Sequence, residues 1–354
     1  MTAPFRLYGA ELSPFSVKVR SYLRFKGLDF EWRERTQARQ EEFGRYAKLP
    51  LAPVLVDADD VATQDSTPMI EALERDYPEP SIIPSDPALA FLSALLEDYA
   101  DEWLNKAMFH YRWSYPEDQD SAAHRLVDAL FEGAAPPEGV EDAVKARMIG
   151  RLHHVGSSME SAPAIEGSFT RLLAILEKAL ASHRYLFGAR PCLADFGLSA
   201  QLKQLLSDPT PGAMLRAQAP HVVAWVERMD GATAEGDFSS FSVLRDTLVD
   251  LLRDEVAGAY MIWMSANAQA VRDDTPGVAI EIAGVPFTQK PQRYAAKAFT
   301  ELRRKRALVA DDANLAALLE ETGCDAFLEP PMAAVGASHE ADEGDGEEDE
   351  GGED

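Results

Sequence analysis

The first eighty residues alternate strand patterns with helical patterns, and this alternation constrains the fold more than any other feature. A strand pattern at residues 5–8 precedes Ser13-Pro14 and a helical run of apolar residues. A proline-bounded strand pattern at 54–56 precedes a helical pattern from Ser66 to about residue 77. Such alternation is typical of a mixed α/β unit, because each helix must bury its apolar face against the sheet. The sequence therefore predicts an α/β unit over residues 1–80.

A proline-rich connector follows, and beyond it the apolar residues recur at helical spacing. The connector prolines are Pro78, Pro80, Pro84 and Pro87. Prolines at this density favour a stiff linker over a helix or a strand. From residue 88 to about 232, apolar residues recur at three- and four-residue steps, as expected for helices with one buried face. The sequence therefore predicts an all-helical unit over residues 88–232.

Residues 233–332 predict a mostly helical extension that contains one small β-hairpin. The hairpin pattern comprises residues 278–282, the turn Ala283-Gly284 and residues 285–287, where Pro286 favours an edge position. Two helices are expected near 291–309 and 311–321, with Gly323 as a C-terminal cap. The segment 333–354 is acidic, glycine-rich and without aromatic residues, so we expect it to be disordered.

The charge and composition restrict the possible partners and the compartment. The formal net charge is −26, and ten of these negative charges lie in the last sixteen residues. An acidic field repels nucleic acids and anionic lipids, and no run of 18 or more apolar residues suggests a membrane span. The two cysteines favour reduced thiols, the first residues lack a signal-peptide pattern, and the histidines show no metal-ligand spacing. We therefore expect a cytoplasmic protein without a metal ion.

Ser13 lies where a helix N-cap belongs, because Pro14 suits the first helical position. A capping role alone would explain the serine. A hydroxyl at a helix N-terminus can also stabilise a bound thiolate, since both the donor and the helix dipole favour the anion. Tyr8, at the end of the first strand, is a rival donor, although a strand tyrosine packed on the sheet is the simpler interpretation. Ser16 is a third candidate.

The segments Ser13-Pro14-Phe15-Ser16, Ala52-Pro53-Val54 and Asp65-Ser66-Thr67 together resemble the N-terminal domain of the glutathione S-transferases. The resemblance extends over about residues 4–232 and implies a thioredoxin-like domain followed by a helical domain. It implies that Ser13 stabilises the glutathione thiolate, in the manner of serine-type enzymes. Both cysteines of the related glutaredoxin motif are serine here, which disfavours thiol–disulfide exchange through this segment.

The same resemblance assigns roles to the other two segments. Pro53 resembles the cis-proline of the family, which would let the backbone of Ala52 and Val54 pair with glutathione like an added strand. Ser66 would bind the γ-glutamyl carboxylate at a helix N-terminus. Asp65 or Gln64 would bind the γ-glutamyl ammonium group. Lys48 is the candidate for the glycyl carboxylate, at a spacing shifted from the family pattern.

The helical unit carries a second signature and an aromatic cluster. Cys192 and Asp195 resemble a capping box in which the expected hydroxyl residue is a cysteine, so we expect a weak cap with a role in folding. Residues 103–113 are rich in aromatic side chains, which are more often core than ligand contacts. If part of this stripe faces the cleft between the domains, it would bind an apolar co-substrate. The candidate pocket residues are Met108, Tyr111, Arg112 and Trp113.

The resemblance implies an enzyme of detoxification that transfers the thiolate of glutathione to a hydrophobic electrophile, and homodimers are usual in the family. The alternative is a non-catalytic protein-interaction module on the same fold. The shifted Lys48, the extension and the acidic tail motivate that alternative.

Overall fold

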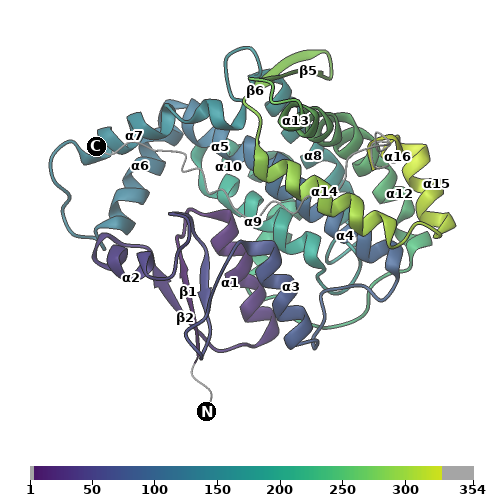
Figure 1. Ribbon diagram of the computed structural model, residues 1–354, viewed down its shortest axis with the longest axis horizontal. Coiled ribbons are helices and arrows are strands. Elements are labelled where there is room, and N and C mark those ends of the chain that lie inside the picture. The colour runs from purple at the N-terminus through teal and green to yellow at the C-terminus, as the bar shows by residue number, and fades with distance from the viewer. Residues whose placement is uncertain (1–3, 329–354) are drawn as a thin grey trace, which may run out of the picture.

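The computed structural model describes residues 4–328, and the segment 333–354, predicted to be disordered, lies outside the described residues. Figure 1 shows an N-terminal unit with a sheet, a helical region, and an extension that crosses the helical region. This arrangement confirms the predicted fold class: a thioredoxin-like unit, a helical unit, and a helical extension with a hairpin. The predicted boundaries between these units remain predictions.

The N-terminal unit is built on a four-stranded mixed sheet with the order β2-β1-β3-β4. Strand β1 runs parallel to β2 and antiparallel to β3, which pairs antiparallel with β4. The strands are β1 (Phe5–Gly9), β2 (Phe30–Glu34), β3 (Val54–Val56) and β4 (Ala62–Gln64). The helices of this unit are α1 (Pro14–Lys26), η1 (Gln37–Arg39), α2 (Gln40–Gly44) and α3 (Ser66–Asp76).

Alternation along the strands gives the sheet two buried faces. Leu7 and Leu55 pack against α1 and α3 and join the main core of the molecule. Tyr8 and Val54 lie on the opposite face and pack against Phe43 of α2. Because both faces are covered, each side chain near the end of a strand is fixed on one side of the sheet.

The helical region packs around α9, whose N-terminus is fixed by a buried aspartate. Asp195 accepts hydrogen bonds from the Cys192 amide and from the Trp225 indole, each at 2.9 Å. The capping hydroxyl that Cys192 lacks is replaced from another helix, since Ser93 Oγ accepts from the Ala194 amide at 3.1 Å. The predicted capping box therefore exists, with a serine of α4 assisting it.

The helices of this region run from α4 to α11. They are α4 (Pro87–Tyr99), η2 (Ala100–Leu104), α5 (Asn105–Ser114), α6 (Pro116–Leu130), α7 (Val140–Ile149), η3 (Leu152–Val155), α8 (Ala162–Leu180), α9 (Leu193–Ser207), α10 (Pro209–Gln218) and α11 (Pro220–Met229). Among residues 4–328, no helix is both long and apolar enough to span a bilayer.

The extension contains the predicted hairpin and six further helices. Its elements are α12 (Phe241–Leu251), η4 (Leu252–Met261), α13 (Ile262–Arg272), β5 (Val278–Ile282), β6 (Val285–Gln289), α14 (Arg293–Ala307), α15 (Ala313–Thr322) and α16 (Asp325–Leu328). The hairpin turn places Ala283 and Gly284 at positive φ, the geometry of a tight two-residue turn. Gly323 ends α15 in the left-handed conformation, as predicted.

A buried carboxylate fastens the extension to the helical region. Glu255 of η4 is fully buried and accepts from the Tyr99 hydroxyl at 3.0 Å and from Arg171 Nε at 2.8 Å. It also accepts from the Ser168 hydroxyl. Burial raises the pKa of Glu255 to about 7, and the hydrogen bonds from Ser168, Arg171 and Tyr99 oppose that rise.

This carboxylate should make stability depend on pH. Because the folded state raises the pKa of Glu255 from 4.5 to about 7, its contribution to the free energy of unfolding is fully present below 4.5 and is lost as the pH rises through about 7. Urea unfolding at several pH values should therefore show a flatter pH dependence for Glu255→Gln than for the wild type. The exposed Glu160→Gln is the control. A Glu255→Gln profile parallel to the wild type would contradict this expectation.

Candidate functional site

The register of the sheet brings the three predicted segments to one end of the N-terminal unit. Tyr8 of β1 pairs with Val54 of β3, and Val54 pairs with Gln64 of β4. The end of β1, the start of β3 and the end of β4 therefore share one edge. The loop to Ser13 leaves from that edge, Ala52-Pro53 enters it, and Asp65-Ser66 leaves it.

Ser13 caps α1 and keeps a donor for a ligand. Its Oγ accepts from the Ser16 amide at 3.3 Å, and the residue is half-buried. Because capping uses a lone pair, the hydroxyl proton remains available for donation. Ser16 is fully buried, and its Oγ accepts from the Ala10 amide at 3.2 Å. Of the two serines, Ser13 is the one that a ligand could reach.

Tyr8 holds a structural position on the α2 face of the sheet. Its side chain is fully buried, and its hydroxyl donates to Glu42 Oε1 at 2.7 Å. Burial, together with Glu42, raises the pKa of Tyr8 to about 12. The rival catalytic assignment of Tyr8 is therefore not supported by this geometry, because its hydroxyl proton already has an acceptor.

The Ala52–Pro53 peptide bond is cis, as the resemblance implied. The loop before it is held by Gln64, whose Oε1 accepts from the amides of Lys48 and Leu49 at 3.1 and 3.0 Å. Gln64 Nε2 donates to the carbonyls of residues 49 and 51. Gln64 therefore positions this loop instead of offering its amide to a ligand, while the Lys48 side chain is exposed.

Asp65 and Ser66 form the N-terminus of α3. Asp65 has φ of 86°, an uncommon conformation for a residue with a side chain, and its Oδ1 accepts from the Thr67 amide at 3.4 Å. Ser66 is buried and accepts at Oγ from Lys18 Nζ at 3.3 Å. The first amides of a helix have no intrahelical acceptor. The start of α3 therefore combines the Ser66 amide, the Ser66 hydroxyl and a nearby cation, a combination that suits a carboxylate.

Lys18, which no motif in the sequence marks, is buried beneath this helix N-terminus. Its ammonium forms ion pairs with Glu97 of α4 and with Asp101 of η2, the latter at 2.6 Å. Burial alone would lower the pKa of Lys18, but Asp101 and Glu97 together raise it further than burial lowers it. Lys18 stands between two valines in an apolar run, so its neighbours in sequence gave no sign of these partners.

The four predicted pocket residues are packed inside the protein, which corrects the prediction that they line an open pocket. Met108, Tyr111, Arg112 and Trp113 are 1–4% exposed. Tyr111 stacks on Tyr115, while Arg112 pairs with Asp208 at 2.8 Å. The aromatic stripe is core because it closes the interior of the helical region.

Arg112 nevertheless supports the site, since its Nη1 donates to the Leu12 carbonyl at 3.0 Å. Half-buried apolar side chains adjoin this position. One small cluster around Trp113 is bordered by Leu12, which precedes Ser13 in the chain, and by Phe109, Met148 and Leu152. Phe109 belongs to the predicted aromatic stripe, whereas the other three come from segments without a motif.

Arg35 is a second cation that no motif in the sequence marks. Its amide donates to the Gly9 carbonyl at 2.8 Å, and its Nη1 donates to the Pro50 carbonyl at 2.8 Å. Burial lowers the pKa of Arg35, and the positive charge of Arg147 adds to that effect. Arg35 therefore lies at the edge of the sheet that carries Ser13 and the cis-proline, close to the helical region.

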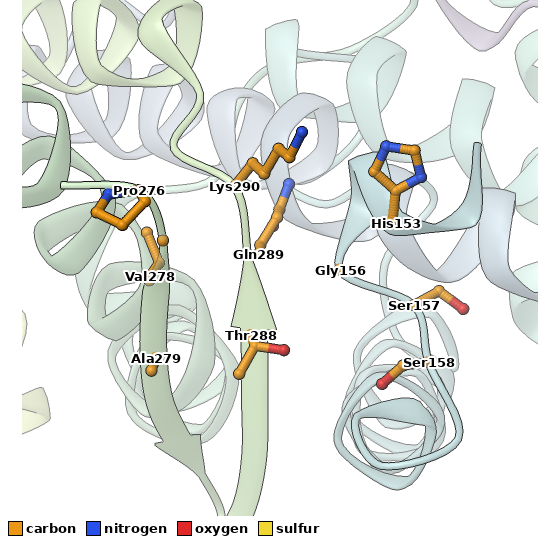
Figure 2. Close-up of a pocket in the computed structure, with 11 residues that line it drawn as sticks. His153, Gly156, Ser157, Ser158, Pro276, Val278, Ala279, Thr288, Gln289 and Lys290 are labelled. Atoms are coloured by element: carbon orange, nitrogen blue, oxygen red, sulfur yellow. The ribbon is translucent and has the colours of Figure 1, made fainter. Parts of the chain in front are cut away.

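A separate cavity of about 520 Å³ lies between the hairpin and the segment 153–158 (Figure 2). Figure 2 shows Thr288 and Lys290 on one side and His153 and Ser158 on the other. The polar atoms of the Gln289 side chain, between Thr288 and Lys290 in the chain, already have partners in the protein. Its Oε1 accepts from Lys106 Nζ at 2.9 Å, and its Nε2 donates to the carbonyl of residue 154. None of the three predicted segments lines this cavity.

Two family models match parts of this chain, and known proteins are similar to it. The family model described as glutathione S-transferase, N-terminal domain, matches residues 7–81, and the model of the C-terminal domain matches residues 144–228. The zeta class glutathione S-transferase of Euphorbia esula is 36% identical over 206 residues, which are 56% of this chain and 74% of that protein.

Two further similarities cover more of the chain at lower identity. The isoprene-epoxide–glutathione S-transferase of Rhodococcus sp. (strain AD45) is 25% identical over 232 residues, which are 62% of this chain and 92% of that protein. A solved glutathione S-transferase from Rhodospirillum rubrum F11 is 20% identical, covers 83% of this chain and 99% of its own, and has a TM-score of 0.46.

Proposed function

The chain belongs to the glutathione S-transferase family, and we propose that it binds glutathione and transfers the glutathione thiolate to a hydrophobic electrophile. One observation carries this proposal: the strand register gathers Ser13, the cis Ala52–Pro53 peptide and Ser66 at one edge of the sheet. Each of the three would hold a different part of the same tripeptide.

Ser13 would donate its hydroxyl proton to the sulfur of glutathione. The thiolate is the nucleophile, and its concentration rises when the pKa of the thiol falls. A hydroxyl donor at the N-terminus of α1 lowers that pKa, because both the hydrogen bond and the helix dipole favour the anion. The electron pair of the thiolate would then form the bond to the electrophile, which releases its leaving group or opens its ring.

The backbone of Ala52 and Val54 would pair with the cysteinyl residue of glutathione, beside the cis-proline. The glycyl carboxylate would lie near Lys48 or Arg35. Arg35 is the better positioned of the two, because its hydrogen bond to Pro50 fixes it two residues from Ala52, whereas Lys48 extends into solvent.

The γ-glutamyl carboxylate would accept hydrogen bonds from the Ser66 hydroxyl and from the Ser66 amide at the start of α3. Lys18 adds a positive charge 3.3 Å from the Ser66 hydroxyl oxygen. Asp65 would bind the γ-glutamyl ammonium group, while Gln64 keeps its structural role in the 48–51 loop.

The electrophile would contact the half-buried side chains that border the cluster around Trp113. Leu12 and Phe109 offer apolar surface there, and Met148 of α7 faces the same cluster. A surface of this kind favours an apolar or aromatic co-substrate. A role in detoxification and a cytoplasmic location belong to this proposal, and homodimer formation stays a prediction.

Titration of glutathione into the purified protein tests the binding step. We expect saturable heat for the wild type and a Kd raised roughly tenfold in Ser66→Ala, because one hydrogen bond to a charged group is lost. Ser240→Ala is the matched control, since Ser240 precedes α12, far along the chain from the site. Absence of binding to the wild type at millimolar glutathione would overturn the proposal.

A non-catalytic interaction module is the second candidate. The burial of Met108, Tyr111, Arg112 and Trp113 favours it, because these four side chains offer almost no surface to an electrophile. Glutathione binding without turnover of any electrophile in a broad panel would support this second candidate over the first.

A further inference from the structure

The extension reaches the N-terminus of α3 and bonds to the residue proposed to bind the ammonium group of glutathione. Tyr294 of α14 donates its hydroxyl proton to Asp65 Oδ2 at 2.6 Å, although 229 positions separate the two residues. Such a short hydrogen bond to a carboxylate is charge-assisted and therefore stronger than one between neutral groups.

Two further contacts fix α14 and its neighbours on this side of the molecule. Lys305 of α14 forms an ion pair with Glu71 of α3 at 2.6 Å. Tyr260 of η4 donates its hydroxyl proton to Asp98 of α4. Because these contacts join the extension to both α3 and α4, the position of Tyr294 is determined by the fold of the extension.

A cavity of about 220 Å³ opens where α3, α4 and α14 meet. Asp65 and Thr67 of α3 line it, as do Glu97 and Asp98 of α4 and Tyr294 and Lys297 of α14. Negative side chains therefore border the cavity on the α3 and α4 sides, and the α14 side adds Lys297, Lys305 and Glu301. The combination complements a group that carries both an ammonium and a carboxylate.

We propose that the extension forms part of the glutathione site, and that Tyr294 is a positioning residue that orients the Asp65 carboxylate toward the γ-glutamyl ammonium group. This inference rests on the proposed function and adds to it a determinant that lies outside the two matched domains. It also gives the extension a role in selecting ligands with a free α-ammonium group.

The two carboxylate oxygens of Asp65 explain how one phenol can act in this way. Oδ1 accepts from the Thr67 amide and Oδ2 accepts from Tyr294, so the plane of the carboxylate is fixed from two sides. An ionised carboxylate has about four acceptor positions. Two of them therefore remain for an ammonium group, already oriented before the ligand arrives.

The test compares glutathione with glutaryl-cysteinyl-glycine, which lacks only the ammonium group. Tyr294→Phe retains the ring and removes the hydroxyl. We expect it to raise the Kd of glutathione about fivefold to tenfold and to leave the Kd of the glutaryl analogue unchanged. In an Asp65→Asn background, Tyr294→Phe should have no further effect on glutathione, because both changes remove the same interaction.

Tyr46→Phe is the matched control, since Tyr46 donates to Asp60 at 2.9 Å in another exposed tyrosine–aspartate pair of the same unit. If Tyr294→Phe raised the Kd of glutathione and of the glutaryl analogue by the same factor, Tyr294 would have only a structural role and the inference would be overturned. Unchanged or tighter glutathione binding by Tyr294→Phe would also overturn it. If the wild type itself bound neither ligand, the proposed function would fail as well, so the two failures are distinguishable.

Discussion

Replacing Lys18 by methionine is expected to lower the free energy of unfolding by about 3–5 kcal/mol. Lys18 is 1% exposed, and its ammonium lies between Glu97 and Asp101. Methionine has a similar length but no charge, so it would leave two carboxylates without their cation in a buried region. An uncompensated buried charge costs far more than a broken surface ion pair.

Urea unfolding of the wild type and of Lys18→Met measures this loss directly. Lys178→Met is the matched control, because the Lys178 side chain is 78% exposed and pairs with Asp250 at 2.9 Å. We expect the control to cost less than about 1 kcal/mol. A loss of that same small size for Lys18→Met would contradict the assignment of Lys18 as the cation that the cluster requires.

A double variant measures how much of the lost stability comes from the unpaired Glu97 carboxylate. Replacing Glu97 by glutamine in the Lys18→Met background should recover part of the lost stability, since one of the orphaned charges disappears with it. Lys18 also contacts Ser66. The ion pairs of Lys18 with Glu97 and Asp101 therefore connect the helical region to the proposed γ-glutamyl site. A weakened cluster should therefore also weaken glutathione binding.

The parts of the fold that local sequence determines could be predicted. The hairpin turn requires positive φ at two adjacent residues, and Ala283-Gly284 with alternating neighbours signals such a turn. Gly323 signals the end of α15 in the same local way. Ser13 was recognisable as an N-cap because Pro14 follows it, and the cis-proline was recognisable from the family resemblance.

The partners of the site residues could not be predicted, because they come from distant segments. Asp65 bonds to Tyr294, and Lys18 bonds to Glu97, across 229 and 79 positions. No spacing rule connects residues so far apart without a known topology. For the aromatic stripe, the sequence predicted a ligand contact where the structure has core packing. A helix with apolar residues on several sides has the same sequence pattern whether it lines a cleft or fills a core.

Replacing Ser13 by alanine is expected to lower kcat/KM for an activated aryl chloride about a hundredfold, the typical cost of removing one donor from a developing or bound anion. The hydroxyl of Ser13 is the one donor at the start of α1 that combines partial exposure with a free proton. Without it, the pKa of bound glutathione should rise toward about 8.5, the value of a free thiol. The pH dependence of kcat/KM should then shift to higher pH.

Loss of the cap must be separated from loss of the donor, because an N-cap serine contributes about 1 kcal/mol to stability. Ser13→Thr keeps both functions and should retain most of the activity. Ser13→Asp keeps the capping oxygen but offers no donor and adds a negative charge, so it should fold normally and show the low activity of Ser13→Ala. If Ser13→Ala turned over the substrate at the wild-type rate and pH optimum, the thiolate would have another donor, and Ser16 and Tyr8 would be the residues to replace next.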